Sequence, residues 1–148
     1  MNSSPRNDLE YSKSQLEQFS GDALLEVMTE KNDADTSTKY VLIKHDFYST
    51  DSDHGREILS GFLTSLINSS YNSIVVYLVD KGVKLLDELN PLYSKMLQLK
   101  EKAEMVVLSE DSLIQYDVIV AESPKLAFES ISSIAEDIMY LDAVLILE

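Results

Sequence analysis

The chain has 148 residues, of which 45% are hydrophobic, and it contains only four glycines and three prolines. This length supports one ordinary hydrophobic core and is too short for two full domains. Twenty-six acidic and twelve basic side chains give a net charge of −14, which repels nucleic-acid phosphates and anionic lipid headgroups alike. We therefore expect no nucleic acid and no membrane as partners.

The chain contains no cysteine, so disulfides, thiolate metal sites and thiol nucleophiles are excluded within it. Its apolar runs are far shorter than the roughly 20 residues that span a bilayer, and its first residues lack the basic and apolar pattern of a signal peptide. These features predict a cytoplasmic protein.

Residues 1–38 are predicted to form an acidic extension. They carry eight acidic and three basic side chains and are rich in Ser, Asn, Asp and Thr at both ends, which is typical of mobile segments. Some apolar residues within the extension recur at helical spacing: Leu16, Phe19, Ala23 and Val27. The prediction is a partly helical or disordered extension, followed by one domain over residues 39–148.

The segment at residues 39–86 predicts a strand, a polar loop, an amphipathic helix and a second strand. Residues 40–43 and 74–79 are short, β-branched apolar runs, as in strands that are buried on both faces of a parallel sheet. The polar loop at residues 45–54 offers several helix caps. The helix is indicated by an apolar stripe: Ile58, Leu59, Phe62, Leu63, Leu66 and Ile67. Together these elements form a βαβ unit, whose crossover should be right-handed.

The pattern becomes helical after a turn centred on Gly82. Residues 83–89 are compatible with a helical turn, and Pro91 stands where a further helix would begin. The buried face of that helix would consist of Leu92, Met96, Leu99 and Ala103. Residues 105–108 then predict the third strand.

The C-terminal third of the chain continues the alternation. Residues 109–117 are polar and fit a loop or a short helix. The fourth strand has two candidates, residues 118–121 and 125–128, which are separated by a proline that donates no ladder hydrogen bond. Apolar residues mark the last helix: Ile131, Ile134, Ala135, Ile138 and Met139. With a final strand at residues 143–147, the prediction is a three-layer α/β/α sandwich on a mostly parallel sheet of about five strands.

Ligands of open parallel sheets bind beyond the carboxyl ends of the strands, so the loops at that edge hold the candidate site. These loops, at residues 45–54, 80–84 and 109–117, offer carboxylates, lysines and serines. The residues predicted to form a ligand-binding pocket are Asp46, Asp80, Lys81, Gly82, Lys84, Ser109, Glu110, Asp111 and Ser112. The two lysines beside the glycine predict a weak anion preference at most.

No catalytic constellation stands out in these loops. Ser112 with His45 or His54 has the residue types of an acyl-transfer triad, although its neighbours do not fit the G-x-S-x-G turn. A small-molecule hydrolase that uses these residues is the alternative function.

The histidines and carboxylates of residues 45–54 are possible metal ligands but more commonly act as caps and turn residues, so no metal is expected. Neither the glycine-rich dinucleotide turn nor the P-loop pattern is present, and no cofactor is expected.

Three stretches resemble the DsrE-like domain, in particular the C-terminal domain of the YedF family of sulfurtransferase-like selenium metabolism proteins. The first, at residues 51–63, reads DSDHGREILSGFL and is similar to the family's acidic loop and G-F-L helix. The second, at residues 76–85, reads VYLVDKGVKL and is similar to its strand followed by G-V-K-L. The third, at residues 106–118, reads VVLSEDSLIQYDV and lines up with a strand followed by C-G-T-C-L-x-x-Y-G-L. The tail at residues 131–147 follows the family's last helix and strand.

The resemblance implies a DsrE-like fold with residues 125–128 as the fourth strand. It also places Ser109 and Ser112 at the two cysteine positions of the third stretch, with Glu110 in place of the glycine between them. A thiolate accepts a sulfane sulfur because it forms near neutral pH and its sulfur is polarizable, and a hydroxyl has neither property. The resemblance therefore implies a non-catalytic binding or scaffolding protein related to sulfur relay or selenium metabolism. It further implies homo-oligomers, or hetero-oligomers with other sulfur-relay-like proteins.

Overall fold

The structure is a computed structural model that describes residues 37–148, of which Thr38–Glu148 form one compact unit. The extension predicted at residues 1–38, including its helical stripe, lies outside the described residues except for its last two. Thr38 begins the first described strand. That strand therefore starts two residues before the predicted run at 40–43.

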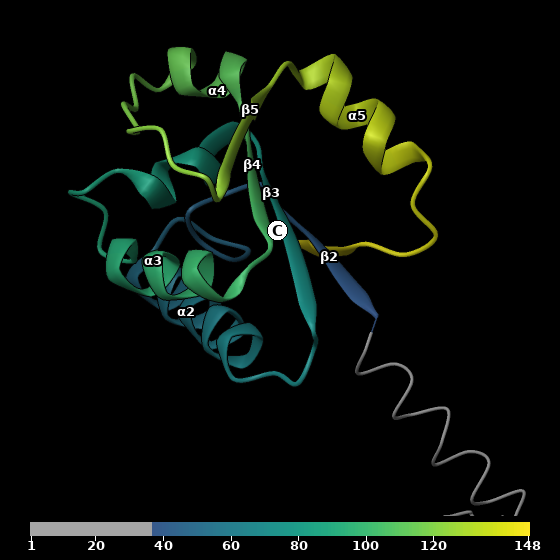
Figure 1. The fold of residues 1–148 in the computed structure, drawn as a ribbon. Coiled ribbons are helices and arrows are strands. Elements are labelled where there is room, and N and C mark those ends of the chain that lie inside the picture. The colour runs from purple at the N-terminus through teal and green to yellow at the C-terminus, as the bar shows by residue number, and fades with distance from the viewer. Residues whose placement is uncertain (1–36) are drawn as a thin grey trace, which may run out of the picture. The chain divides into compact units, whose positions relative to one another are not determined.

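Strands and helices alternate along the described chain, as Figure 1 shows. In chain order they are β2 (Thr38–Ile43), α2 (Asp53–Ile67), β3 (Ser73–Leu78), the 3-10 helix η1 (Asp80–Leu86), α3 (Tyr93–Lys102), β4 (Met105–Ser109), α4 (Glu110–Gln115), β5 (Leu126–Glu129), α5 (Ile131–Met139) and β6 (Leu145–Leu147). The fourth strand of the prediction is thus β5, and the candidate at residues 118–121 forms no strand. Residues 109–117, for which a loop or a helix was expected, contain the short helix α4.

The five strands form one sheet in the order β5-β4-β3-β2-β6. Every neighbouring pair is parallel, and β2 and β3 pair over their full lengths. The predicted α/β class and five-strand sheet are confirmed, and the sheet is entirely rather than mostly parallel. Because β6 returns to the far side of β2, the strand order reverses between these two strands.

Helices cover both faces of the sheet, which gives the predicted three layers. Helices α2 and α3 pack on one face, where residues such as Val76 of β3 and Leu63 of α2 form the larger core. Helix α5 packs on the other face, where Ile134 meets Tyr77 and Val107 in a smaller core. Successive residues of β3 thus enter opposite cores, because side chains alternate across a strand.

The two amphipathic helices are buried to different extents. The predicted stripe of α2 is buried at Leu59, Leu63 and Leu66. On α5 only Ile134 of the predicted stripe is fully buried, and Met139 remains 76% exposed. In the described part of the chain, α5 is the helix that packs on this face, through Ile134 and Ile138, while Ile131 and Met139 remain exposed. No helix among residues 37–148 is both long and apolar enough to cross a membrane.

Candidate functional site

The turn between β3 and η1 packs directly on the end of β2. Asp80 has a left-handed backbone with φ of 50°. Gly82 is buried, and a Cβ atom at this position would lie 2.2 Å from the carbonyl oxygen of Ile43. Since Gly82 does not have a positive φ, the close backbone approach explains the glycine. The predicted turn residues Asp80, Lys81 and Gly82 are therefore fixed at the carboxyl edge of the sheet.

Two serines, Ser109 and Ser112, lie close together where β4, the next strand along the sheet, meets α4. Ser109 is the last residue of β4 and is fully buried, and its hydroxyl caps α4 by accepting from the amide of Ser112 at 3.2 Å. The hydroxyl of Ser112 donates to Ser109 Oγ at 3.1 Å and accepts from the amide of Asp80 at 2.8 Å. The structure thus brings together three of the predicted site residues from two neighbouring strand ends.

Tyr116 completes this group, although the sequence prediction did not include it. Its hydroxyl donates to Asp80 Oδ1 at 2.7 Å, and Lys84 Nζ lies 5.5 Å from the centre of its ring. The hydrogen bond to Asp80 raises the pKa of Tyr116, and desolvation and the charge of Asp80 add to this effect. Two signals indicated this residue: it follows Ser112 by about one helical turn, and it matches the tyrosine of the third family-like stretch.

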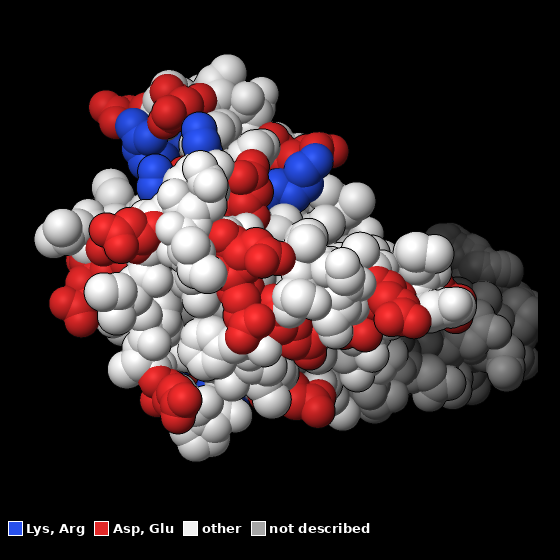
Figure 2. Space-filling model, turned by 90° about the horizontal axis from the view of Figure 1, so that it is seen from above, with Lys and Arg blue, Asp and Glu red and all other residues white. Residues whose placement is uncertain are grey.

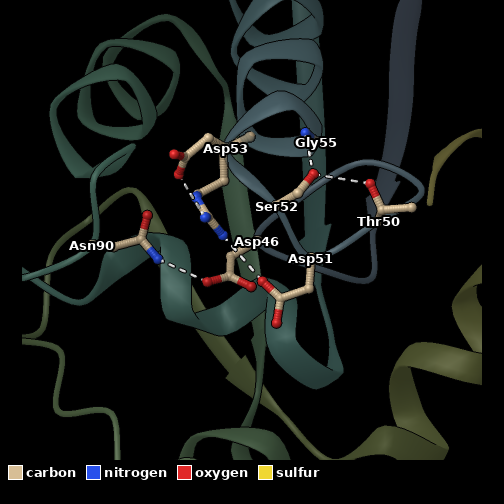
Figure 3. Close-up of polar contacts among 8 residues, drawn as sticks. Asp46, Thr50, Asp51, Ser52, Asp53, Gly55 and Asn90 are labelled. Atoms are coloured by element: carbon tan, nitrogen blue, oxygen red, sulfur yellow. Dashed lines mark hydrogen bonds and ion pairs between the residues drawn. The ribbon is translucent and has the colours of Figure 1, made fainter.

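Two further predicted residues, Asp46 and Lys81, have contacts outside the group around the serine pair. Asp46 accepts a hydrogen bond from Asn90 Nδ2 at 3.0 Å, a contact drawn in Figure 3. Lys81 Nζ lies 6.0 Å from the centre of the Phe47 ring. Asn90 lies 44 positions after Asp46 in the chain, and the sequence analysis did not identify it as a partner of Asp46.

The two acidic residues that follow Ser109, Glu110 and Asp111, have different surroundings. Asp111 accepts from the backbone amide of Ile131 at 3.1 Å, which joins the start of α5 to α4. Glu110 is exposed. Of the nine predicted site residues, Asp80, Ser109, Ser112 and Lys84 therefore form one group with Tyr116.

The carboxylates of the β2–α2 loop have structural partners. The guanidinium of Arg56 donates to Asp51 at 3.0 Å and to Asp53 at 2.9 Å, as Figure 3 shows. The hydrogen bond to Asp53 is the main reason why the pKa of Arg56 is raised. Ser52 caps α2 by accepting from the amide of Gly55 at 3.0 Å. Within residues 37–148 no group of three or more His, Asp or Glu residues could hold a metal ion.

Neither histidine is placed to activate Ser112. His45 stacks on Phe47 with ring centres 4.8 Å apart and an interplanar angle of 4°. His54 Nδ1 lies 3.6 Å from Glu57 Oε1 on the exposed side of α2. The hydroxyl of Ser112 bonds to Ser109 and Asp80 instead, so this geometry supplies no general base of the kind that a serine nucleophile needs.

The β2–α2 loop also occupies the point where the strand order reverses. The amide of Ser49 donates to the carbonyl of Glu148 at 2.9 Å, and Lys44 Nζ pairs with the Glu148 carboxylate at 2.6 Å. The hydrogen bond from Lys44, followed by its charge, lowers the pKa of Glu148. Open α/β sheets commonly bind ligands at such a reversal, but here the loop bonds directly to the residue that follows β6.

Figure 2 looks onto the carboxyl edge of the sheet, and acidic side chains cover much of it while basic ones gather in small groups. The group around Ser109 and Ser112 offers hydroxyls, a carboxylate and an ammonium, but no thiol. Its chemistry is that of hydrogen bonding and charge. No protein-family model and no curated protein matches the chain.

Proposed function

We propose that the chain is a cysteine-less DsrE-like domain that acts in the cytoplasm as a non-catalytic binding or scaffolding protein of sulfur relay or selenium metabolism. The observation that carries this proposal is the serine pair. Ser109 and Ser112, which the resemblance places at the family's cysteine positions, have their hydroxyl oxygens 3.1 Å apart where β4 meets α4.

The surroundings of the pair suit a former thiol site. Ser109 is fully buried, whereas Ser112 is partly exposed, so a reactive group at position 112 would be accessible from solvent. A persulfide on a thiol there could pass its outer sulfur to a thiolate at position 109 and return to the thiolate form. The hydroxyls of this chain cannot do so, because they do not ionise near neutral pH and form no persulfide.

What the group retains is the capacity to bind. Asp80, Tyr116 and Lys84 surround Ser112 with a carboxylate, a phenol and an ammonium. These groups suit a polar small molecule or a cysteine-bearing segment of another relay protein. Assembly into homo-oligomers or hetero-oligomers with sulfur-relay-like proteins belongs to the same proposal.

A transfer assay tests the absence of catalysis. The purified chain is incubated with thiosulfate and a thiol acceptor, and sulfite release is followed over time. We expect no turnover above the rate without protein, because the chain has no group that could carry the sulfur. Turnover that scales with the concentration of the chain would overturn the proposal, and light scattering on the same sample measures the expected oligomer.

A further inference from the structure

Two loops on one side of the domain enclose a cleft that is lined by strongly exposed hydrophobic side chains. Leu89, in the turn after η1, is 91% exposed, and Ile119, in the loop after α4, is 90% exposed. Both line the same cleft, and Figure 1 shows their loops on the same side of the sheet. Single exposed apolar residues are normal, but two that share a cleft form a candidate contact surface.

The backbone holds both side chains outward. The amide of Leu89 donates to Asp87 Oδ1 at 3.0 Å, and the amide of Asn90 donates to the Asp87 carbonyl at 2.9 Å, which makes a tight turn. In the other loop Val118 is only 6% exposed. The amide of Val118 donates to the Leu113 carbonyl at 2.9 Å, whereas the next side chain, Ile119, is 90% exposed. The exposure of Leu89 and Ile119 is thus built into hydrogen-bonded loops.

The cleft adjoins a second one, which shares Ile119 and Glu88 with it. The apolar side chains that line the second cleft belong to Leu86, Tyr93, Leu97, Ile119, Val120, Ala121 and Leu126. We call the two clefts together the side groove. Its lining residues come from the turn after η1, from α3, from the loop after α4 and from the edge strand β5.

The end of the side groove at Leu89 is acidic. Asp87, Glu88 and Asp117 line it beside the two exposed apolar residues. Within residues 37–148, the carboxylates of Glu88 and Asp117 have no hydrogen-bond or ion-pair partner. The lining of the second cleft includes one cation, Lys100. For this acidic end a second copy is a poor occupant, because the chain has 26 acidic and only 12 basic side chains and offers few cations to pair with it. Assembly through another surface is not affected by this shortage of cations.

We propose that the side groove binds a segment of a partner protein that presents leucine- or isoleucine-like side chains flanked by lysine or arginine. The apolar side chains would cover Leu89 and Ile119, and the cations would pair with Glu88 and Asp117. Apolar anchors surrounded by complementary charges are the usual composition of such contacts. The proposal does not depend on the serine pair, since neither Ser109 nor Ser112 lines the groove.

Fluorescence anisotropy with the full chain tests this proposal. The probe is a short labelled peptide that alternates lysine with leucine, and the comparison peptides alternate lysine with serine or glutamate with leucine. We expect the lysine–leucine peptide to bind most tightly. The double variant Leu89→Ser/Ile119→Ser should weaken that binding by about tenfold or more, because the contact loses the burial of two large apolar side chains.

The matched control is Ile131→Ser/Met139→Ser, which removes two exposed apolar side chains from α5. It should bind the lysine–leucine peptide as the unmodified chain does. Equal binding by the groove variant and the unmodified chain would overturn the proposal, as would equal binding of the glutamate–leucine peptide. Sedimentation that shows a dimer abolished by Leu89→Ser/Ile119→Ser would also overturn it, because the occupant would then be a second copy.

Discussion

At Gly82 the backbone of the β3–η1 turn meets the end of β2, and the absence of a side chain permits this contact. The amide of Val79 donates to the Ile43 carbonyl at 3.2 Å, and a Cβ atom on Gly82 would lie 2.2 Å from the same oxygen. The position of Asp80, and with it the partner of Ser112, depends on this contact. The absence of a Cβ atom at position 82 therefore allows the arrangement of the candidate site.

The substitution Gly82→Ala should destabilise the chain by about 2 kcal/mol or more, because a methyl group must displace backbone rather than a flexible side chain. Chemical denaturation measures the change. The control is Gly61→Ala, since nothing lies within 4 Å of a Cβ at that helical position. It should stabilise the chain by about 0.5–1 kcal/mol. Equal effects of the two substitutions would contradict the predicted close approach.

The hydrogen bond between Tyr116 and Asp80 predicts a pH dependence. The carboxylate raises the pKa of Tyr116, so the bond is present at neutral pH and is lost as the pH rises through that raised value. Asp80→Asn should move the tyrosine pKa down toward its usual value of about 10. NMR of ¹³C-labelled tyrosine measures it, with Tyr116→Phe to assign the signal. An unchanged titration in Asp80→Asn would show that the bond does not form.

At the scale of elements, helix α2 depends on its N-terminal cap. Ser52 accepts from the amide of Gly55 and is held in turn by Thr50 Oγ1 at 3.0 Å. Ser52→Ala should lower the free energy of unfolding by about 1 kcal/mol, because the first turn loses an acceptor. Ser65→Ala, on the exposed side of the same helix, should be neutral or slightly stabilising. A Ser52→Ala loss no greater than that of Ser65→Ala, measured by thermal unfolding, would exclude the cap.

Short-range patterns predicted most elements of the fold. The β-branched runs became buried parallel strands, and the stripe of α2 became a buried face, because both depend on local spacing. The residues alone did not locate strand β5, since Pro124 separates two similar apolar runs at residues 118–121 and 125–128. The resemblance to the DsrE-like domain favoured residues 125–128, where the strand lies. The exposure of Met139 on α5 was not predictable, because it depends on how much of the sheet one helix covers.

The candidate site was predictable only in part for the same reason. Asp80, Ser109 and Ser112 were predicted at one edge of the sheet because they lie in loops that follow parallel strands. In the structure, hydrogen bonds join these three residues. The separation of Asp46 from this group follows from Asn90, a partner 44 residues away that no local pattern indicates. Tyr116 was within reach of the prediction, because its spacing from Ser112 is that of one helical turn.

For the whole molecule, one sheet carries two surfaces with different chemistry. The carboxyl edge holds the serine pair among hydrogen-bonding and charged groups, while the side groove combines apolar side chains with the carboxylates of Asp87, Glu88 and Asp117. We propose a binding role for each of the two surfaces. The strongly acidic chain directs both toward cationic or polar partners.

Restoring the thiol tests most directly whether the serine pair stands where a sulfur-relay pair would. Ser112→Cys is compared with Ser133→Cys, since both serines are partly exposed and each follows a capping serine by three residues. Each variant is incubated with thiosulfate, whose sulfane sulfur a thiolate can take up as a persulfide with release of sulfite, and its intact mass is measured. The account predicts the gain of one sulfur atom on Ser112→Cys and none on Ser133→Cys. Equal loading of the two variants, or no loading of Ser112→Cys, would contradict it.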